Sequence, residues 1–233
     1  MLKIPTVDDW WKLTLKYPQF HHVSNSSLKD YGYMEAFAYL DDNPSATRIL
    51  EFGHGFNPAL FARYGAEREV WGLDDWQDLH YFPEKDEWYR KFDAEVRDKV
   101  PPRCKFVRGL LGNGVDVPEN YFDVICSISV LEELPIDAVL PVIEHAARLL
   151  KSGGVLIGSH DTCAMQDERV KKYCEIQTSA GLELPDYIPP ITFDHRTLIE
   201  NPTAAMFWYQ GQTPAERWYY GHWSTVWSIA KKQ

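Results

Sequence analysis

Short apolar runs alternate with longer amphipathic stretches over most of the chain. Each run is four to eight residues long and rich in β-branched or aromatic side chains, as expected of a buried strand. Five such runs occur, at residues 48–52, 69–73, 104–108, 121–128 and 155–159. Strands that alternate with helices favour an α/β fold, in which a mostly parallel sheet is covered on both faces.

The stretches between the runs have helical character. We expect helices at residues 58–64, 76–100 with a break at Pro83, 131–150 and 165–180. Pro135 and Pro141 exclude one uninterrupted helix, so the regular part of residues 131–150 is expected to start late. Gly153 and Gly154 are expected to stop that helix.

The two ends of the chain follow different patterns. Residues 205–209 and 223–230 are aromatic runs without a convincing helix between them, and they predict an antiparallel strand pair. Residues 1–47 contain amphipathic segments broken at Pro18 and a helical segment at 34–40. We therefore expect a helical N-terminal extension or lid (1–47) packed on one domain (48–233), whose doubly wound sheet has seven strands.

Composition and charge narrow the class of partner. The chain has 233 residues, 45% of them hydrophobic, and a formal charge of −10. An acidic protein repels phosphate backbones, which argues against nucleic acid as a partner. The sequence shows neither a signal-peptide core nor an apolar run that could span a bilayer, so we expect a cytoplasmic protein without a membrane partner. A homodimer is compatible with these features.

The four cysteines do not form a recognisable metal or disulfide pattern. Cys104, Cys126, Cys163 and Cys174 lack the spacing of a zinc site. Buried, reduced thiols are the simplest interpretation.

The first apolar run ends in a glycine loop at Gly53 and Gly55. In an open parallel sheet, ligands bind beyond the carboxyl ends of the strands. Glycine lets the backbone approach a ligand closely, and Asn57 and Pro58 suit the start of a helix. Asp74 ends the next strand, 19 residues after Gly55, where a carboxylate can accept two hydrogen bonds from a ribose diol. The pattern favours a ribose-bearing ligand.

Two alternatives remain for this pattern. The loop could be a plain strand–helix turn, and the neighbouring Asp75 could bind the ribose in place of Asp74. A dinucleotide such as NAD is disfavoured, because Pro58 stands at the third glycine position of the G-x-G-x-x-G fingerprint. Proline also removes a backbone N–H that a pyrophosphate would use.

The glycine loop and the runs after it resemble class I S-adenosylmethionine (SAM)-dependent methyltransferases. Residues 49–55 look like the first motif of that family, and residues 70–74 resemble its acidic-strand motif. Residues 121–135 are similar to its fourth strand and the following helix start, and residues 148–156 to its fifth-strand motif. The resemblance covers residues 48–160 in the right order. It implies a Rossmann-like fold, SAM as cofactor and methyl transfer to an acceptor.

The resemblance also assigns residues to the cofactor. It implies that Glu51, in place of the common Asp, reaches the methionine amino group. His54 replaces Cys, Asn57 replaces Gly, and Leu110 stands near the position of an acid that often binds adenine. The candidate cofactor-binding residues are Glu51, Gly53, His54, Gly55, Asn57, Asp74, Asp75, Leu110 and Ser127.

His160 and Asp161, directly after the fifth run, are the best-placed catalytic candidates. A histidine could take a proton from the acceptor, and Asp161 could orient it or bind a substrate amine. The alternative is that His160 packs under a loop and Asp161 caps a helix. Ser127 and Ser129 stand where a second carboxylate would be needed, so we expect no metal.

Further candidates lie outside these runs. His21, His22, Tyr31 and Tyr33 could cover the site or contact substrate, although such residues often only pack. His195 could shape an acceptor pocket or cap a loop. The sequence thus predicts SAM-dependent methyl transfer to a small molecule, such as a sugar or natural product. The alternative is a non-catalytic protein that kept the SAM-binding fold.

Overall fold

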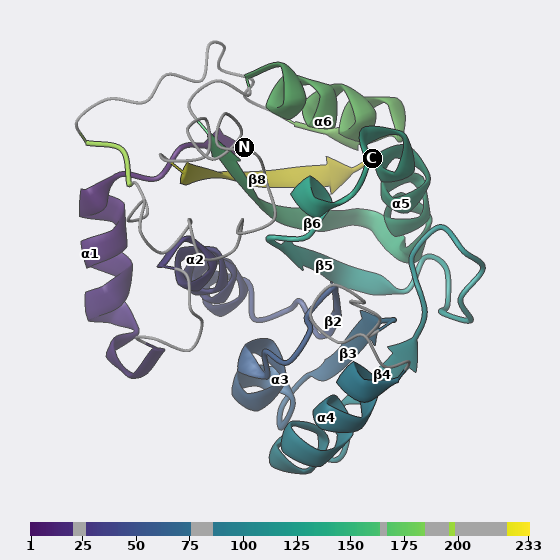
Figure 1. The fold of residues 1–233 in the computed structure, drawn as a ribbon. Helices are drawn as coiled ribbons and strands as arrows, with labels where there is room; N and C mark the ends of the chain where they lie inside the picture. The colour runs from purple at the N-terminus through teal and green to yellow at the C-terminus, as the bar shows by residue number, and fades with distance from the viewer. Residues whose placement is uncertain (21–26, 76–85, 164–166, 185–195, 199–222) are drawn as a thin grey trace.

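The computed structural model describes residues 1–20, 27–75, 86–163, 167–184, 196–198 and 223–233 (Figure 1). Its core is one sheet of eight strands, with order β1-β8-β6-β5-β2-β3-β4 and β7 paired to β8. The strands are β1 (Leu2–Lys3), β2 (Arg48–Phe52), β3 (Glu69–Asp74), β4 (Lys105–Arg108), β5 (Phe122–Ile128), β6 (Leu150–Cys163), β7 (Leu182–Glu183) and β8 (Trp223–Lys232).

Helices cover both faces of this sheet (Figure 1). They are α1 (Val7–Lys16), α2 (Ser27–Asp42), α3 (Ala59–Tyr64), α4 (Glu87–Glu95), α5 (Ile136–Leu149) and α6 (Asp167–Ser179), with single 3₁₀ turns at Pro18–Phe20, Arg97–Lys99 and Leu131–Glu133. One buried hydrophobic cluster packs helices α1, α2, α3 and α4 against one face of the sheet. A second cluster packs α5 and α6 against the other face. The predicted doubly wound, Rossmann-like architecture is confirmed.

The five strands from β2 to β6 run parallel, and β8 runs antiparallel to β6. The expected terminal strand at 223–230 is therefore present as β8, and in the described structure it pairs with β6, β1 and β7. Its predicted partner at 205–209 lies outside the described residues. Among the described residues the sheet has eight strands, two of which, the two-residue strands β1 and β7, were not predicted.

The late start expected for residues 131–150 is confirmed, because α5 begins at Ile136, directly after Pro135. The helix nevertheless continues through Pro141, which it accommodates. The predicted helix stop at the two glycines was wrong. The glycines at 153 and 154 do not stop a helix but lie within β6, which starts at Leu150. Gly153 has φ +78°, and the pairing register with β5 shifts at this point. The glycine pair therefore forms an irregularity in a long strand, because glycine tolerates the left-handed backbone there.

Helix α2, from the N-terminal extension, packs directly on the sheet. It begins at Ser27, earlier than the predicted residue 34, and buries Leu28, Met34 and Leu40 in the cluster shared with α3 and α4. The helix runs antiparallel to the parallel strands. Its last turn meets the amino end of β3, where Arg68 donates to the carbonyl of Leu40 over 3.0 Å. The N-terminal half of α2 therefore reaches the carboxyl edge of the sheet.

Candidate cofactor site

The glycine loop lies at the switch point of the sheet. Strand β2 pairs with β3 on one side and with β5 on the other, so the loop after β2 faces the crevice where open α/β sheets bind ligands. Gly53 and Gly55 have φ of +69° and +56°. A Cβ on Gly53 would lie 2.5 Å from a methyl of Val130. Both the backbone angle and the close approach therefore require glycine at position 53.

Asp74 holds this loop in place. The Gly55 N–H donates to Asp74 Oδ2 over 2.9 Å, and the Gly53 N–H donates to the carbonyl of Leu73 over 2.9 Å. Asp74 is buried at the end of β3. The structure thus brings together the glycine loop and the acid that the sequence paired as a ribose site.

Asn57 shapes the start of α3. Its side-chain Oδ1 accepts a hydrogen bond from the Ala59 N–H over 2.9 Å, and its own N–H donates to the His54 carbonyl over 2.9 Å. The side chain therefore forms an Asx turn that leads into α3, and its backbone closes the loop. These contacts keep the turn compact although a glycine is missing here.

His54 does not present its ring to a ligand. The ring is 1% exposed and packs against Phe61, Phe92 and Phe106, with centroid distances of 5.0, 5.4 and 5.8 Å. Burial lowers the pKa of His54 to about 3, so the ring is neutral. A Cβ on Gly72 would lie 2.7 Å from Nε2. The predicted cofactor contact is therefore restricted to the His54 backbone, because the side chain is part of the aromatic core.

Glu51 is a fully buried carboxyl group at the end of β2. The Tyr33 hydroxyl donates to Glu51 Oε1 over 2.6 Å. Glu51 Oε2 is buried and has no hydrogen-bond partner among the described residues. Burial raises the pKa of Glu51 to about 8, although the hydrogen bond from Tyr33 opposes the shift. A buried acceptor without a partner at this edge is suited to a ligand donor.

The remaining predicted cofactor residues lie along the same edge. Leu110 follows β4 and is 45% exposed, and the Asp75 carbonyl accepts from Arg108 Nε over 3.3 Å. Ser127 is fully buried near the end of β5, and its Oγ has no partner within the described part of the chain. Ser129 has φ +53°, and its N–H donates to the Ser159 carbonyl over 2.9 Å.

His160 lies in the core rather than in the crevice. It is 2% exposed, its ring centroid is 5.3 Å from that of Tyr173 on α6, and Nε2 is 3.5 Å from Ser228 Oγ. Burial lowers the pKa of His160 to about 4. This placement does not support the predicted role as a base, because the ring is enclosed by α6 and β8.

Asp161 lies beside an acid that sequence reasoning missed. The Asp161 N–H donates to Glu132 Oε1 over 3.0 Å. Burial and the neighbouring Asp161 raise the pKa of the Glu132 carboxyl well above its usual range. Glu132 lies in the 3₁₀ turn that follows β5. The only sequence signal for it as a site residue was its position directly after a predicted strand. The two acids lie after β5 and near the end of β6, which leaves Asp161 as a candidate on the acceptor side.

Two other tyrosine candidates lie in α2. Tyr31 is buried and donates its hydroxyl to Glu35, so it does not face the glycine loop. Tyr33 contacts Glu51, as described above. The candidates His21, His22 and His195 lie outside the described residues.

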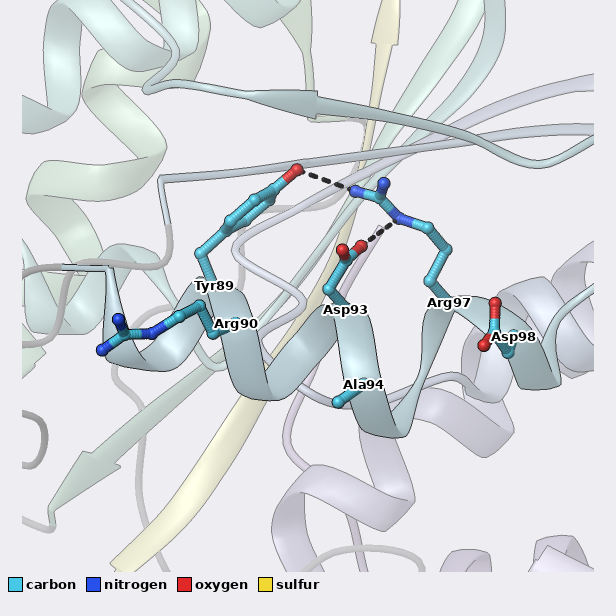
Figure 2. A pocket seen from close by; sticks show the side chains of 6 residues that line it. All are labelled: Tyr89, Arg90, Asp93, Ala94, Arg97 and Asp98. Atoms are coloured by element: carbon cyan, nitrogen blue, oxygen red, sulfur yellow. Dashed lines mark hydrogen bonds and ion pairs between the residues drawn. The ribbon is translucent and has the colours of Figure 1, made fainter.

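A hollow also occurs along α4 and the 3₁₀ turn that follows it. Its lining consists of Tyr89, Arg90, Asp93, Ala94, Arg97 and Asp98 (Figure 2). Arg97 pairs with Asp93 over 2.7 Å and donates to the Tyr89 hydroxyl over 2.9 Å (Figure 2). Arg97, in the 3₁₀ turn after α4, is thus held by Asp93 and Tyr89 of that helix, so the hollow is not a candidate cofactor site.

Neither a metal site nor a membrane span is found in the described part of the chain. No group of three or more His, Cys, Asp or Glu side chains there could hold a metal ion. None of the helices in the same ranges has the length and apolar character needed to cross a bilayer.

Comparisons with known proteins agree with this geometry. Residues 50–158 match the family model described as a methyltransferase domain. A search of curated proteins finds no match. A solved structure titled a TehB-like SAM-dependent methyltransferase from Corynebacterium glutamicum is 16% identical, with a TM-score of 0.54, and the match covers 97% of this chain and 99% of that one.

Two further structures share the fold. One is titled a putative sarcosine dimethylglycine methyltransferase from Galdieria sulphuraria, with 14% identity, a TM-score of 0.53, and coverage of 97% of this chain and 98% of that one. The other is titled the [4+2]-cyclase SpnF, with 16% identity, a TM-score of 0.58, and coverage of 84% and 80%. The family model thus matches a methyltransferase domain at residues 50–158, and the three solved structures share the fold around it.

Proposed function

We propose that this protein transfers a methyl group from SAM to a small-molecule acceptor. The observation that carries the proposal is the group formed by the glycine loop, Asp74 and Glu51 at the switch point of the sheet. The loop offers backbone without side chains, Asp74 offers a carboxylate for a ribose diol, and Glu51 in its ionised form offers Oε2 as an acceptor for an ammonium group. The two acids therefore fit the ribose and the ammonium group of SAM.

The charge of the chain supports a small acceptor. A formal charge of −10 disfavours nucleic acid, and the family match covers only the methyltransferase domain. When bound, SAM supplies an activated methyl on a sulfonium. The protein then has to orient the acceptor in line with that methyl and keep water away. Asp161, near the end of β6, and Glu132, in the turn after the neighbouring β5, can orient a polar acceptor or take its proton.

Calorimetry with SAM and S-adenosylhomocysteine tests the cofactor assignment. We expect both ligands to bind the wild-type protein, and we expect Asp74→Ala to abolish binding, because the variant loses the ribose contact and the bond to Gly55. Wild-type protein that binds neither ligand would refute the proposal. Retained affinity in Asp74→Ala would show that the ribose contact is misassigned.

A screen of small amines, alcohols and sugars, with S-adenosylhomocysteine release as the readout, tests methyl transfer.

A second candidate function is that of a protein with the SAM-binding fold that does not methylate. The resemblance in fold to a structure titled a [4+2]-cyclase and the replaced loop positions His54 and Asn57 favour it. Cofactor binding without release of S-adenosylhomocysteine from any acceptor would support this second function.

A further inference from the structure

Helix α1 exposes a row of large apolar side chains. Val7, Trp11 and Leu15 are 40%, 57% and 78% exposed. Because side chains four residues apart share a helix face, the three form one continuous apolar stripe along α1. Single exposed apolar residues are common on protein surfaces and need no explanation. A contiguous stripe that contains a tryptophan is instead typical of a surface that binds a partner.

The rest of α1 is fixed to the domain, so a rigid helix presents the stripe. Leu13 is buried in the cluster that joins α1 to α2, α3 and the sheet. Thr6 and Asp9 form a capping box at the start of α1. Directly after its end, the Tyr17 hydroxyl donates to Asp41 Oδ2 of α2 over 2.9 Å. The helix lies at the margin of the molecule (Figure 1). A partner would meet a preformed surface and lose little conformational entropy in ordering it.

Charged side chains border the stripe in a self-complementary order. Asp8 lies in the first turn of α1, and Lys12 and Lys16 follow it at intervals of four residues, all three of them exposed. The border is therefore acidic toward the start of the helix and basic toward its end. An antiparallel copy of α1, centred on Trp11, would place its lysines opposite this acid. At 1.5 Å per residue, Asp8 would lie about 3 Å along the axis from the level of the partner's Lys12.

We propose that α1 is the interface of a homodimer, in which the apolar stripes of two copies pack antiparallel across a two-fold axis at Trp11. A two-fold interface is self-complementary, so Trp11 contacts the partner's Trp11 and Val7 contacts the partner's Leu15. Side chains four residues apart form one of the ridges by which helices pack together. A pair of helices buries less surface than a standard interface, so the dissociation constant should be micromolar. This inference is independent of the proposed function.

Sedimentation velocity of the full chain tests the interface. Over a concentration series from submicromolar to submillimolar, the mass of the wild type should rise from 27.0 kDa toward twice that value. Trp11→Glu should raise the dissociation constant at least about thirtyfold, because it removes the central aromatic contact of both copies. Leu15→Glu should act in the same direction, and the 78% exposure of Leu15 keeps this variant usable if Trp11→Glu fails to fold. Leu140→Glu is the matched control, because Leu140 is a 38% exposed apolar residue of α5, and it should leave the dimer unchanged.

A pair of charge variants tests the antiparallel arrangement. Asp8→Lys alone and Lys12→Glu alone should each weaken the dimer about fivefold, because like charges then meet across the axis. An equimolar mixture of the two variants should recover the affinity of the wild type, because the new Lys and the new Glu pair between subunits. Repulsion within one helix would persist in the mixture, so recovery reports contacts between the two copies.

Three results would overturn the proposal. The first is a wild type that stays monomeric at every concentration. If that monomer co-sediments with vesicles of anionic lipid and Trp11→Glu does not, the stripe binds a membrane surface instead. The second is a dimer that both Trp11→Glu and Leu15→Glu leave intact, because the copies would then meet through another surface. The third is a mixture of charge variants that binds no more tightly than either variant alone.

Discussion

Replacing Glu51 by Gln should make the protein more stable at neutral pH. Glu51 is buried with a pKa of about 8, against an ordinary value of 4.5. A pKa raised by folding means that the native state binds the proton more tightly, so the stability from the neutral form is complete below pH 4.5 and is lost as the pH rises through about 8. Gln is neutral at every pH and keeps the shape of the protonated side chain.

The size of the effect follows from the two pKa values. At 1.36 kcal/mol per pH unit, the gap between 4.5 and about 8 corresponds to about 5 kcal/mol when Glu51 is fully ionised. At pH 7 the same linkage gives about 3 kcal/mol. The free energy of unfolding of Glu51→Gln should therefore equal that of the wild type near pH 4.5 and exceed it by about 3 kcal/mol at pH 7.

Urea unfolding of both proteins at several pH values between 4.5 and 8 measures this difference. His54 and His160 have pKa values lowered to about 3 and 4, so their contributions are present above pH 6.5 and are lost on acidification. The histidines are the same in both proteins, and the difference between the two curves isolates Glu51. A constant difference across this range would refute a buried, protonated Glu51.

Three further substitutions test separate parts of the structure. Gly53→Ala should destabilise the protein by at least about 2 kcal/mol and abolish S-adenosylhomocysteine binding. The reason is that φ at this position is +69° and the new Cβ would clash with Val130. Thermal unfolding measures the loss of stability, and calorimetry measures the loss of binding. Asp123→Ala should lower the free energy of unfolding by about 2 kcal/mol, since Asp123 accepts from the Thr47 and Arg48 N–H groups. The affinity for ligands should not change. Urea unfolding measures the stability, and a variant as stable as the wild type would contradict this prediction. His160→Ala should lower the free energy of unfolding by about 2 to 3 kcal/mol, because it leaves a cavity beside Tyr173. The rate of methyl transfer should not change. A variant of unchanged stability that transfers methyl groups more slowly would show that His160 takes part in the mechanism.

The strands and the glycine loop could be predicted because they depend on local pattern. Buried parallel strands are nearly continuous apolar runs, and a loop that approaches a neighbouring side chain closely excludes a Cβ, as at Gly53. The glycines at 153 and 154 were misassigned because glycine serves equally at a helix end and in a strand irregularity. Only the pairing partner of the strand distinguishes the two.

The site side chains were harder to predict, because their roles depend on which face of the sheet they occupy. Side chains alternate between the two faces of a strand, so His160 lies on the same face of β6 as the buried Leu156 and points to α6. This alternation could have indicated from the sequence that His160 is buried. His54 is held by aromatic residues from three other elements. The partner of Glu51 comes from α2, outside the motifs, and no local pattern links Tyr33 to that strand.

The bond from the Gly55 N–H to Asp74 has a consequence for how fast a ligand is captured. This bond lies within the protein and needs no ligand atom, so the conformational entropy of the loop is lost during folding and not during binding. A ribose would then meet a rigid surface, and association would not wait for a rearrangement of the loop. Differences in affinity among nucleoside ligands should consequently reside in their dissociation rates.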